Sequence, residues 1–180
     1  MTDQTLFLWI HGLAGKSQVL DFFGIFFADY LGYFLILGAI FLIWSLKDYK
    51  KQAQYLFFTV LTLILSRGIF TELIRFLYYR PRPYLALNFT ALVTEDHTSA
   101  LPSGHAAAFF ALAGIVYLLN KKWGQYFIGA AAIMSVARVF AGVHWPLDII
   151  AGALVGFLSV YLVNRLLPLP KLEENQKLPR

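Results

Sequence analysis

The chain has 180 residues, of which 59% are hydrophobic, 17% aromatic and only 14% charged. This length favours one domain, and the composition is rare in water-soluble domains but typical of proteins that cross a membrane several times. The net charge of +5 does not indicate nucleic-acid binding, because the basic residues are scattered over short segments, and the absence of cysteine excludes a disulfide framework or a thiolate metal site.

The apolar runs predict an all-α, polytopic membrane helix bundle. A spanning helix needs about 20 mostly apolar residues. The N-terminal stretch at residues 6–28 is broken by polar residues and glycine, and we expect one or two helices lying at the membrane interface there. The clearest runs then predict five spans, at residues 30–46, 54–74, 104–120, 124–143 and 146–167. If the N-terminal stretch also crosses the bilayer, the bundle has six spans.

The predicted organisation is one membrane domain with two short terminal segments. Residues 1–29 form the N-terminal interfacial helical segment, and residues 30–167 form the transmembrane domain. Residues 168–180 are polar and form a C-terminal tail, as expected for a terminus that nothing ties down.

The distribution of basic residues predicts the orientation, because cytoplasmic loops of membrane proteins carry an excess of Lys and Arg. Such residues follow the first span and the third span and occur in the tail: Lys47, Lys50, Lys51, Lys121, Lys122, Arg165, Lys171, Lys177 and Arg180. In a five-span arrangement all three regions lie on one side, which is therefore the predicted cytoplasmic side.

Three polar clusters lie at the opposite, outer ends of the predicted spans. They are residues 75–83 (RFLYYRPRP), 102–105 (PSGH) and 138–148 (RVFAGVHWPLD). Arginine side chains bind oxyanions, and Arg138 lies deep in a predicted span, where it needs an anionic partner. Together the clusters indicate phosphoryl chemistry at one membrane face.

Two of the clusters contain residues that suit catalysis, and each has a simpler explanation. Ser103 and Gly104 begin an apolar helix and could form an anion cradle with its free N–H groups, or serve only as a helix cap. Pro146 suits the first helical position, which places Asp148 in the first turn. Asp148 could then orient His144 as a nucleophile or base, or merely complement the helix dipole.

The arginines around the second span are assigned from their positions. Arg75 and Arg82 are expected to face the site, and Arg82 can bind a phosphate bidentately. For Arg80 the favoured interpretation is a side chain that extends to the lipid headgroups. Arg67 and Glu72 lie within the span and are predicted to form a structural ion pair.

A metal site could be built from His105, His144 and Asp148. Three arginines aimed at the same pocket would repel a divalent cation, whereas they would neutralise a phosphate. We therefore expect neither a metal nor another cofactor.

The three polar clusters resemble the sequence motifs of the type-2 phosphatidic acid phosphatases, a family that shares its site with the vanadium haloperoxidases. The family motifs are Lys-x6-Arg-Pro, Pro-Ser-Gly-His and Ser-Arg-x5-His-x3-Asp. The matching residues here are Arg75, Arg82 and Pro83, then residues 102–105, then Ala137, Arg138, His144 and Asp148. The chain departs from the family in having Arg75 in place of Lys and Ala137 in place of Ser.

The resemblance implies a metal-independent phosphatase. His144 would attack phosphorus and form a phosphohistidine, Asp148 would orient it, and His105 would protonate the leaving oxygen and then assist water. The groups implied to hold the phosphoryl oxygens are Arg75, Arg82, Ser103, the Gly104 amide and Arg138.

More narrowly, the short length and the N-terminal pattern resemble the small bacterial undecaprenyl-diphosphatases of the bacitracin-resistance type. This implies a protein of the bacterial plasma membrane that converts undecaprenyl diphosphate to the monophosphate and phosphate at the outer face. Its expected partners are the lipid substrate and the bilayer, with no nucleic acid, and the sequence indicates no oligomeric state. The alternatives are a phosphatidylglycerophosphate or phosphatidate phosphatase and, in another class, an anion-binding membrane transporter.

Overall fold

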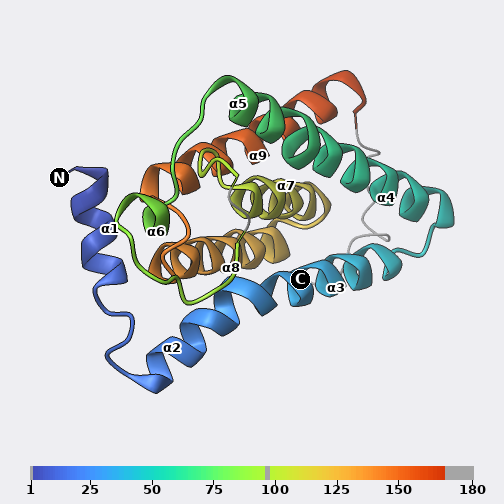
Figure 1. Cartoon of the computed structure of the whole chain (residues 1–180). Coiled ribbons are helices and arrows are strands. Elements are labelled where there is room, and N and C mark those ends of the chain that lie inside the picture. The colour runs from blue at the N-terminus through green and yellow to red at the C-terminus, as the bar shows by residue number, and fades with distance from the viewer. Residues whose placement is uncertain (1, 96–97, 169–180) are drawn as a thin grey trace.

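The computed structural model describes residues 2–95 and 98–168, and all regular elements within these ranges are helical (Figure 1). The prediction of an all-α protein is therefore confirmed for the described residues. Most of the predicted tail, from residue 169 onward, lies outside them.

The N-terminal part of the chain forms one short helix and one long helix. Helix α1 spans Asp3–His11, and at 1.5 Å per residue its nine residues cover only about 14 Å, less than half of a bilayer core. The long helix, Gln18–Trp44, consists of α2 (Gln18–Ile25), the π-helical turn η1 (Phe26–Tyr30) and α3 (Leu31–Trp44). The domain boundary predicted between residues 29 and 30 falls inside this helix, because its apolar character continues on both sides.

A second long helix follows, and it also contains a π-helical segment. It runs over Tyr49–Leu77 and comprises α4 (Tyr49–Leu63), η2 (Ile64–Phe70) and α5 (Thr71–Leu77). The remaining helices are α6 (Pro83–Ala86), α7 (Gly104–Leu119), α8 (Lys121–Phe140) and α9 (Pro146–Leu166).

Among the described residues, three helices are long and apolar enough to cross a membrane: Gln18–Trp44, Tyr49–Leu77 and Pro146–Leu166. Helix α7 is apolar but has only 16 residues. Large apolar side chains such as Phe34, Phe41 and Leu154 are more than half exposed, as expected for helices that face lipid. A polytopic membrane bundle is therefore confirmed, whereas the number of five spans stays a prediction.

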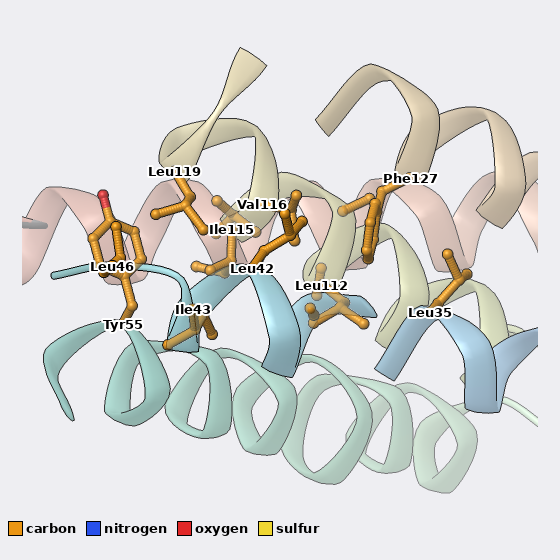
Figure 2. Close-up of a cluster of buried hydrophobic side chains, with 14 residues drawn as sticks. Leu35, Leu42, Ile43, Leu46, Tyr55, Leu112, Ile115, Val116, Leu119 and Phe127 are labelled. Atoms are coloured by element: carbon orange, nitrogen blue, oxygen red, sulfur yellow. The ribbon is translucent and has the colours of Figure 1, made fainter. Parts of the chain in front are cut away.

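Helix α7 lies in the interior of the bundle and packs most extensively against α8 and α9 (Figure 1). The largest group of buried apolar side chains joins α7 to α3, α4 and α8, through residues such as Ile115, Leu42, Tyr55 and Phe127 (Figure 2). This core fixes α7 as the centre around which the other helices are arranged.

Glycines allow α9 to approach the backbone of α7 closely. A Cβ atom at Gly152 would lie 2.5 Å from the Ser103 carbonyl oxygen, and one at Gly156 would lie 2.6 Å from the Ala107 carbonyl oxygen. The close approach is accompanied by a hydrogen bond from the Ser103 N–H to the Asp148 carbonyl oxygen at 2.9 Å. The first turns of α7 and α9 are thereby brought together.

Candidate active site

The three polar clusters of the sequence meet at one end of the bundle, where α5 ends and α7 and α9 begin. Arg75 donates to the Pro102 carbonyl oxygen at 3.2 Å, which joins the first cluster to the second. Arg82 donates to the Val143 carbonyl oxygen at 3.2 Å, which joins the first to the third. The bond between Ser103 and Asp148 joins the second to the third. The predicted convergence of the clusters is thus present.

Arg82 is buried, with 1% of its surface exposed, and its guanidinium contacts Thr98, Val143, His144 and Glu95. It donates to the Thr98 carbonyl oxygen at 3.1 Å and to the Thr98 hydroxyl at 3.2 Å. One terminal nitrogen lies 3.5 Å from Nε2 of His144, and the other lies 3.6 Å from a Glu95 carboxylate oxygen. Held from several sides, Arg82 presents a fixed positive charge next to the imidazole of His144.

Arg138, at the end of α8, is the second buried arginine, also 1% exposed. It donates to the Ala28 carbonyl oxygen at 3.3 Å and to Asp29 at 3.4 Å, and it forms an ion pair with Glu95. The anionic partners that a deeply placed arginine requires are therefore these two carboxylates. Asp29 carries a signal that could have revealed it, because a carboxylate inside an apolar aromatic run is rarely without a function.

His144 and Asp148 lie beside each other, as the four-residue spacing predicts. Nδ1 of His144 is 3.6 Å from Oδ2 of Asp148, and both side chains are almost fully buried. Oδ2 of Asp148 also accepts a 2.8 Å hydrogen bond from the Trp145 N–H, so that the carboxylate caps α9 as well. The geometry is compatible with both explanations of Asp148, since the carboxylate lies in the first turn of α9 and beside His144.

The environment of His144 favours a neutral imidazole. His144 lies in the loop between α8 and α9, and burial is the main cause that lowers its pKa well below the usual 6.5. The positive charges of Arg138 and Arg82 lower this pKa further. A neutral imidazole has a free electron pair, which a nucleophile or base requires.

Arg80 also joins the site, and the expectation that it extends to the lipid headgroups is wrong. It donates to Oδ1 of Asp148 at 2.6 Å and forms an ion pair with Asp3 of α1. Its guanidinium lies over the Trp145 ring, 5.3 Å from the ring centre. Asp3 in turn accepts a 2.9 Å hydrogen bond from the Leu147 N–H at the start of α9. The N-terminal helix thus takes part in fixing the carboxylate next to His144.

The PSGH segment forms the start of α7. Ser103 is the N-cap residue, buried, and its hydroxyl accepts a 3.4 Å hydrogen bond from the Ala106 N–H. His105 follows in the first turn, partly buried, and lines a cavity of about 140 Å³ with Asp29, Tyr33 and other residues of the first long helix. Ser103 therefore caps α7, and His105 forms part of the wall of this cavity.

His105 and the arginines share the surroundings of His144. Along with Arg138 and Arg82, both His105 and Arg75 lie close enough to act electrostatically on its ring. Nearly all of the sequence-predicted site residues are thereby gathered around one imidazole. Within residues 2–95 and 98–168, no three His, Asp or Glu side chains come together as ligands for a metal ion.

Arg67 and Glu72 form the ion pair that was predicted for them. Glu72 also accepts a 3.3 Å hydrogen bond from Arg75. The side chains of Arg67 and Glu72 are about half exposed, at 46% and 50%, whereas that of Arg75 is 9% exposed.

Residues 55–170, about two thirds of the chain, match the PAP2 superfamily. The chain belongs to this superfamily. The family membership that the three motifs predict is thus confirmed, and the protein is a membrane-embedded phosphatase.

Similarity to individual proteins agrees with the family. The chain is 29% identical over 158 residues to a Bacillus licheniformis protein named bacitracin transport permease protein BcrC, covering 87% of this chain and 76% of that protein. It is 26% identical over 162 residues to the undecaprenyl-diphosphatase BcrC of Bacillus subtilis, covering 89% and 81%. The crystal structure of Aquifex aeolicus LpxE superposes with a TM-score of 0.72 at 26% identity, over 90% of this chain and 94% of that one.

Proposed function

We propose that the protein is a lipid phosphatase that hydrolyses undecaprenyl diphosphate to undecaprenyl monophosphate and inorganic phosphate. The observation that carries this proposal is the pair of buried arginines, Arg82 and Arg138, beside the buried imidazole of His144. The diphosphate substrate is supported by the relative from Bacillus subtilis, which is named undecaprenyl-diphosphatase BcrC, and by a relative from Sulfolobus acidocaldarius that is named undecaprenyl-diphosphatase.

The first step forms a phosphohistidine. Nε2 of His144, which lies on the side of Arg82, attacks the terminal phosphorus while Nδ1 faces Asp148. An N–P bond forms, the P–O bond to the lipid phosphate breaks, and His105 gives its proton to the leaving oxygen. Asp148 stabilises the positive charge that develops on the imidazole.

The second step returns the enzyme to its starting state. His105 takes a proton from water, the resulting hydroxide attacks phosphorus, and the N–P bond breaks with release of phosphate. Five groups hold the phosphoryl oxygens through both steps: Arg75, Arg82, Ser103, the Gly104 amide and Arg138. The arginines neutralise the charge that grows in the transition state, so no metal ion is needed.

The site is assigned to the outer face of the bacterial plasma membrane. Lys47, Lys50, Lys121 and Lys122 lie at the end of the bundle opposite the site, as the positive-inside rule requires for an outward-facing site. In intact cells, a cysteine introduced at Asn88 should react with an impermeant maleimide, and a cysteine at Lys121 should not. Equal labelling of the two positions would contradict this orientation.

The reaction is tested by phosphate release from undecaprenyl diphosphate by the purified protein in detergent containing EDTA. Wild type should release phosphate, and His144→Ala should lose at least about a thousand-fold in rate, because the nucleophile is removed. With substrate labelled at the terminal phosphate, a base-stable and acid-labile phosphoprotein should form in wild type and not in His144→Ala.

Other outcomes would point to other functions. Release from phosphatidylglycerophosphate or phosphatidate, without release from undecaprenyl diphosphate, would establish a glycerolipid phosphatase. Transport of a lipid or of bacitracin without phosphate release would establish a permease, the activity that the name of the Bacillus licheniformis relative states. Loss of activity in EDTA with recovery in a divalent cation would contradict the metal-free mechanism.

A further inference from the structure

Arg67 is a cation at the edge of the site that the family motifs do not include. It lies in the π-helical segment η2, two turns before Arg75 on the same long helix. Its side chain is 46% exposed, in contrast to the buried Arg82 and Arg138. Segments with π-helical geometry inside an α-helix occur frequently at functional sites.

The Arg67 side chain lies against the start of α7. A Cβ atom at Gly104 would lie 2.5 Å from Nε and 2.8 Å from Cδ of Arg67. The side chain therefore lies directly against the residue that precedes His105. Among the charged groups that act electrostatically on His105, Arg67 has the largest effect.

We propose that Arg67 binds the second phosphate of the substrate, the one that departs with the lipid, and thereby favours diphosphates over monophosphates. This inference rests on the proposed function, because it assumes that His105 protonates the leaving oxygen. A group beside His105 then lies beside the leaving group, whereas Arg82 and Arg138 lie beside the phosphorus that His144 attacks.

The charge of the leaving group explains why a cation is useful at this position. When a diphosphate is cleaved, the leaving group is a lipid phosphate, which gains negative charge as the P–O bond breaks. When a phosphate monoester is cleaved, the leaving group is an alcohol and carries no phosphate. Arg67 can therefore stabilise the transition state of the first reaction without affecting that of the second.

The guanidinium groups of Arg67 and Arg75 lie close to each other. Both donate to Oε1 of Glu72, so that the side chain of Arg67 reaches along the helix from η2 towards the site. A phosphate bound by Arg67 would therefore lie next to the phosphoryl group that Arg75 is proposed to hold, as the second phosphate of a diphosphate must.

Glu72 holds Arg67 without preventing it from binding a phosphate. Both side chains of this ion pair are about half exposed, and exposed ion pairs contribute little because water already solvates both charges. A phosphate offers more acceptor oxygens and more charge than one carboxylate, so it can replace Glu72 as the partner of Arg67.

The test compares wild type with Arg67→Gln on undecaprenyl diphosphate, with orthophosphate and inorganic pyrophosphate as competing inhibitors. We expect kcat/KM to fall about 10- to 100-fold, as for loss of one hydrogen-bonded charge. Inhibition by pyrophosphate should weaken about 10-fold, whereas inhibition by orthophosphate, which occupies only the terminal-phosphate position, should stay within about twofold. Arg67→Lys should recover part of the lost activity, since it restores the charge without the planar fork.

Two further variants serve as controls. Arg165→Gln removes an exposed arginine near the far end of α9 and should leave kcat/KM and both inhibition constants unchanged. Glu72→Gln removes the carboxylate that pairs with both Arg67 and Arg75 and should keep or strengthen pyrophosphate inhibition.

Two results would separate failure of this inference from failure of the proposed function. If wild type hydrolyses undecaprenyl diphosphate but Arg67→Gln weakens inhibition by both anions equally, or by neither, the assignment of Arg67 is wrong and the function stands. If wild type releases no phosphate from undecaprenyl diphosphate, the proposed function is wrong and the assignment of Arg67 falls with it.

Discussion

The two sides of the site differ in how their cations are held. Around His144, Arg82 and Arg138 are 1% exposed and are bonded to backbone carbonyl oxygens and carboxylates from distant parts of the chain. Around His105, Arg67 is 46% exposed and is paired with Glu72 of its own helix. The first side is organised before any substrate arrives, which is the condition under which charges stabilise a transition state most effectively. The second side can adapt to the ligand.

The difference between the two sides can be tested by substitution. Removal of a buried, preorganised cation should cost the most activity, and changes to the residues that support the buried side should cost less.

Arg138→Ala is expected to have the largest effect of these variants. Loss of one preorganised donor to a developing oxyanion costs about 100- to 1,000-fold in kcat. Arg138→Lys should recover only part of this, because an ammonium lacks the planar guanidinium fork. The measurement is phosphate release under saturating substrate, with elution volume in detergent as the check on folding. A loss smaller than that of Arg67→Gln would contradict the view that the buried side carries most of the rate.

Arg80→Gln should have an intermediate effect, because Arg80 acts on His144 through Asp148. Loss of a charge-assisted hydrogen bond corresponds to about 1.5–3 kcal/mol, or roughly 10- to 100-fold in kcat/KM. The pH profile separates positioning from simple destabilisation. Because the pKa of His144 is lowered from 6.5, the acidic limb of kcat/KM should lie below pH 6.5 in wild type.

In Arg80→Gln this limb should move to higher pH. The variant loses a positive charge near the site and frees Asp148 to stabilise the imidazolium, and both changes raise the pKa of His144. Asp3→Asn should shift the limb in the opposite direction, to lower pH, and by a smaller amount, since it removes a negative charge and leaves the charge of Arg80 to act on Asp148 and His144. An unchanged profile in both variants would show that Arg80 and Asp3 serve only the stability of the fold.

Gly152→Ala tests the packing that brings Asp148 to the site, without altering any charge. The added Cβ would lie 2.5 Å from the Ser103 carbonyl oxygen and 2.8 Å from Cβ of Ala106, so that α7 and α9 must separate. Overpacking of this kind costs about 1–3 kcal/mol and should lower the Tm in detergent. Gly129→Ala on α8 is the matched control, because no atom lies within 4 Å of its added Cβ. Equal Tm values for the two variants would contradict the close packing.

Much of the site could be predicted because its chemistry is local in sequence. The three motifs contain both histidines, Asp148 and three of the arginines, and the spacing of His144, Pro146 and Asp148 fixes their relation through helix geometry alone. The all-α membrane architecture followed from the apolar runs. These inferences need no knowledge of how distant segments meet.

The parts that could not be predicted depend on contacts between distant segments. Asp3 and Asp148 share Arg80 although they are separated by almost the whole chain. Glu95 bridges Arg82 and Arg138 from a loop that has no motif of its own. The π-helical turns in the two long helices have no periodic sequence signature, so the apolar pattern alone does not show where they occur.

Glu95 has a consequence for turnover. Its carboxylate contacts both Arg82 and Arg138, and Asp29 supplies a second carboxylate at Arg138, so in the proposed reaction an incoming phosphoryl group would replace carboxylates as the partner of these arginines. The same carboxylate can return to the arginines as the product departs, which weakens the retention of inorganic phosphate. In the proposed reaction, such a resident counter-ion would oppose tight retention of the product.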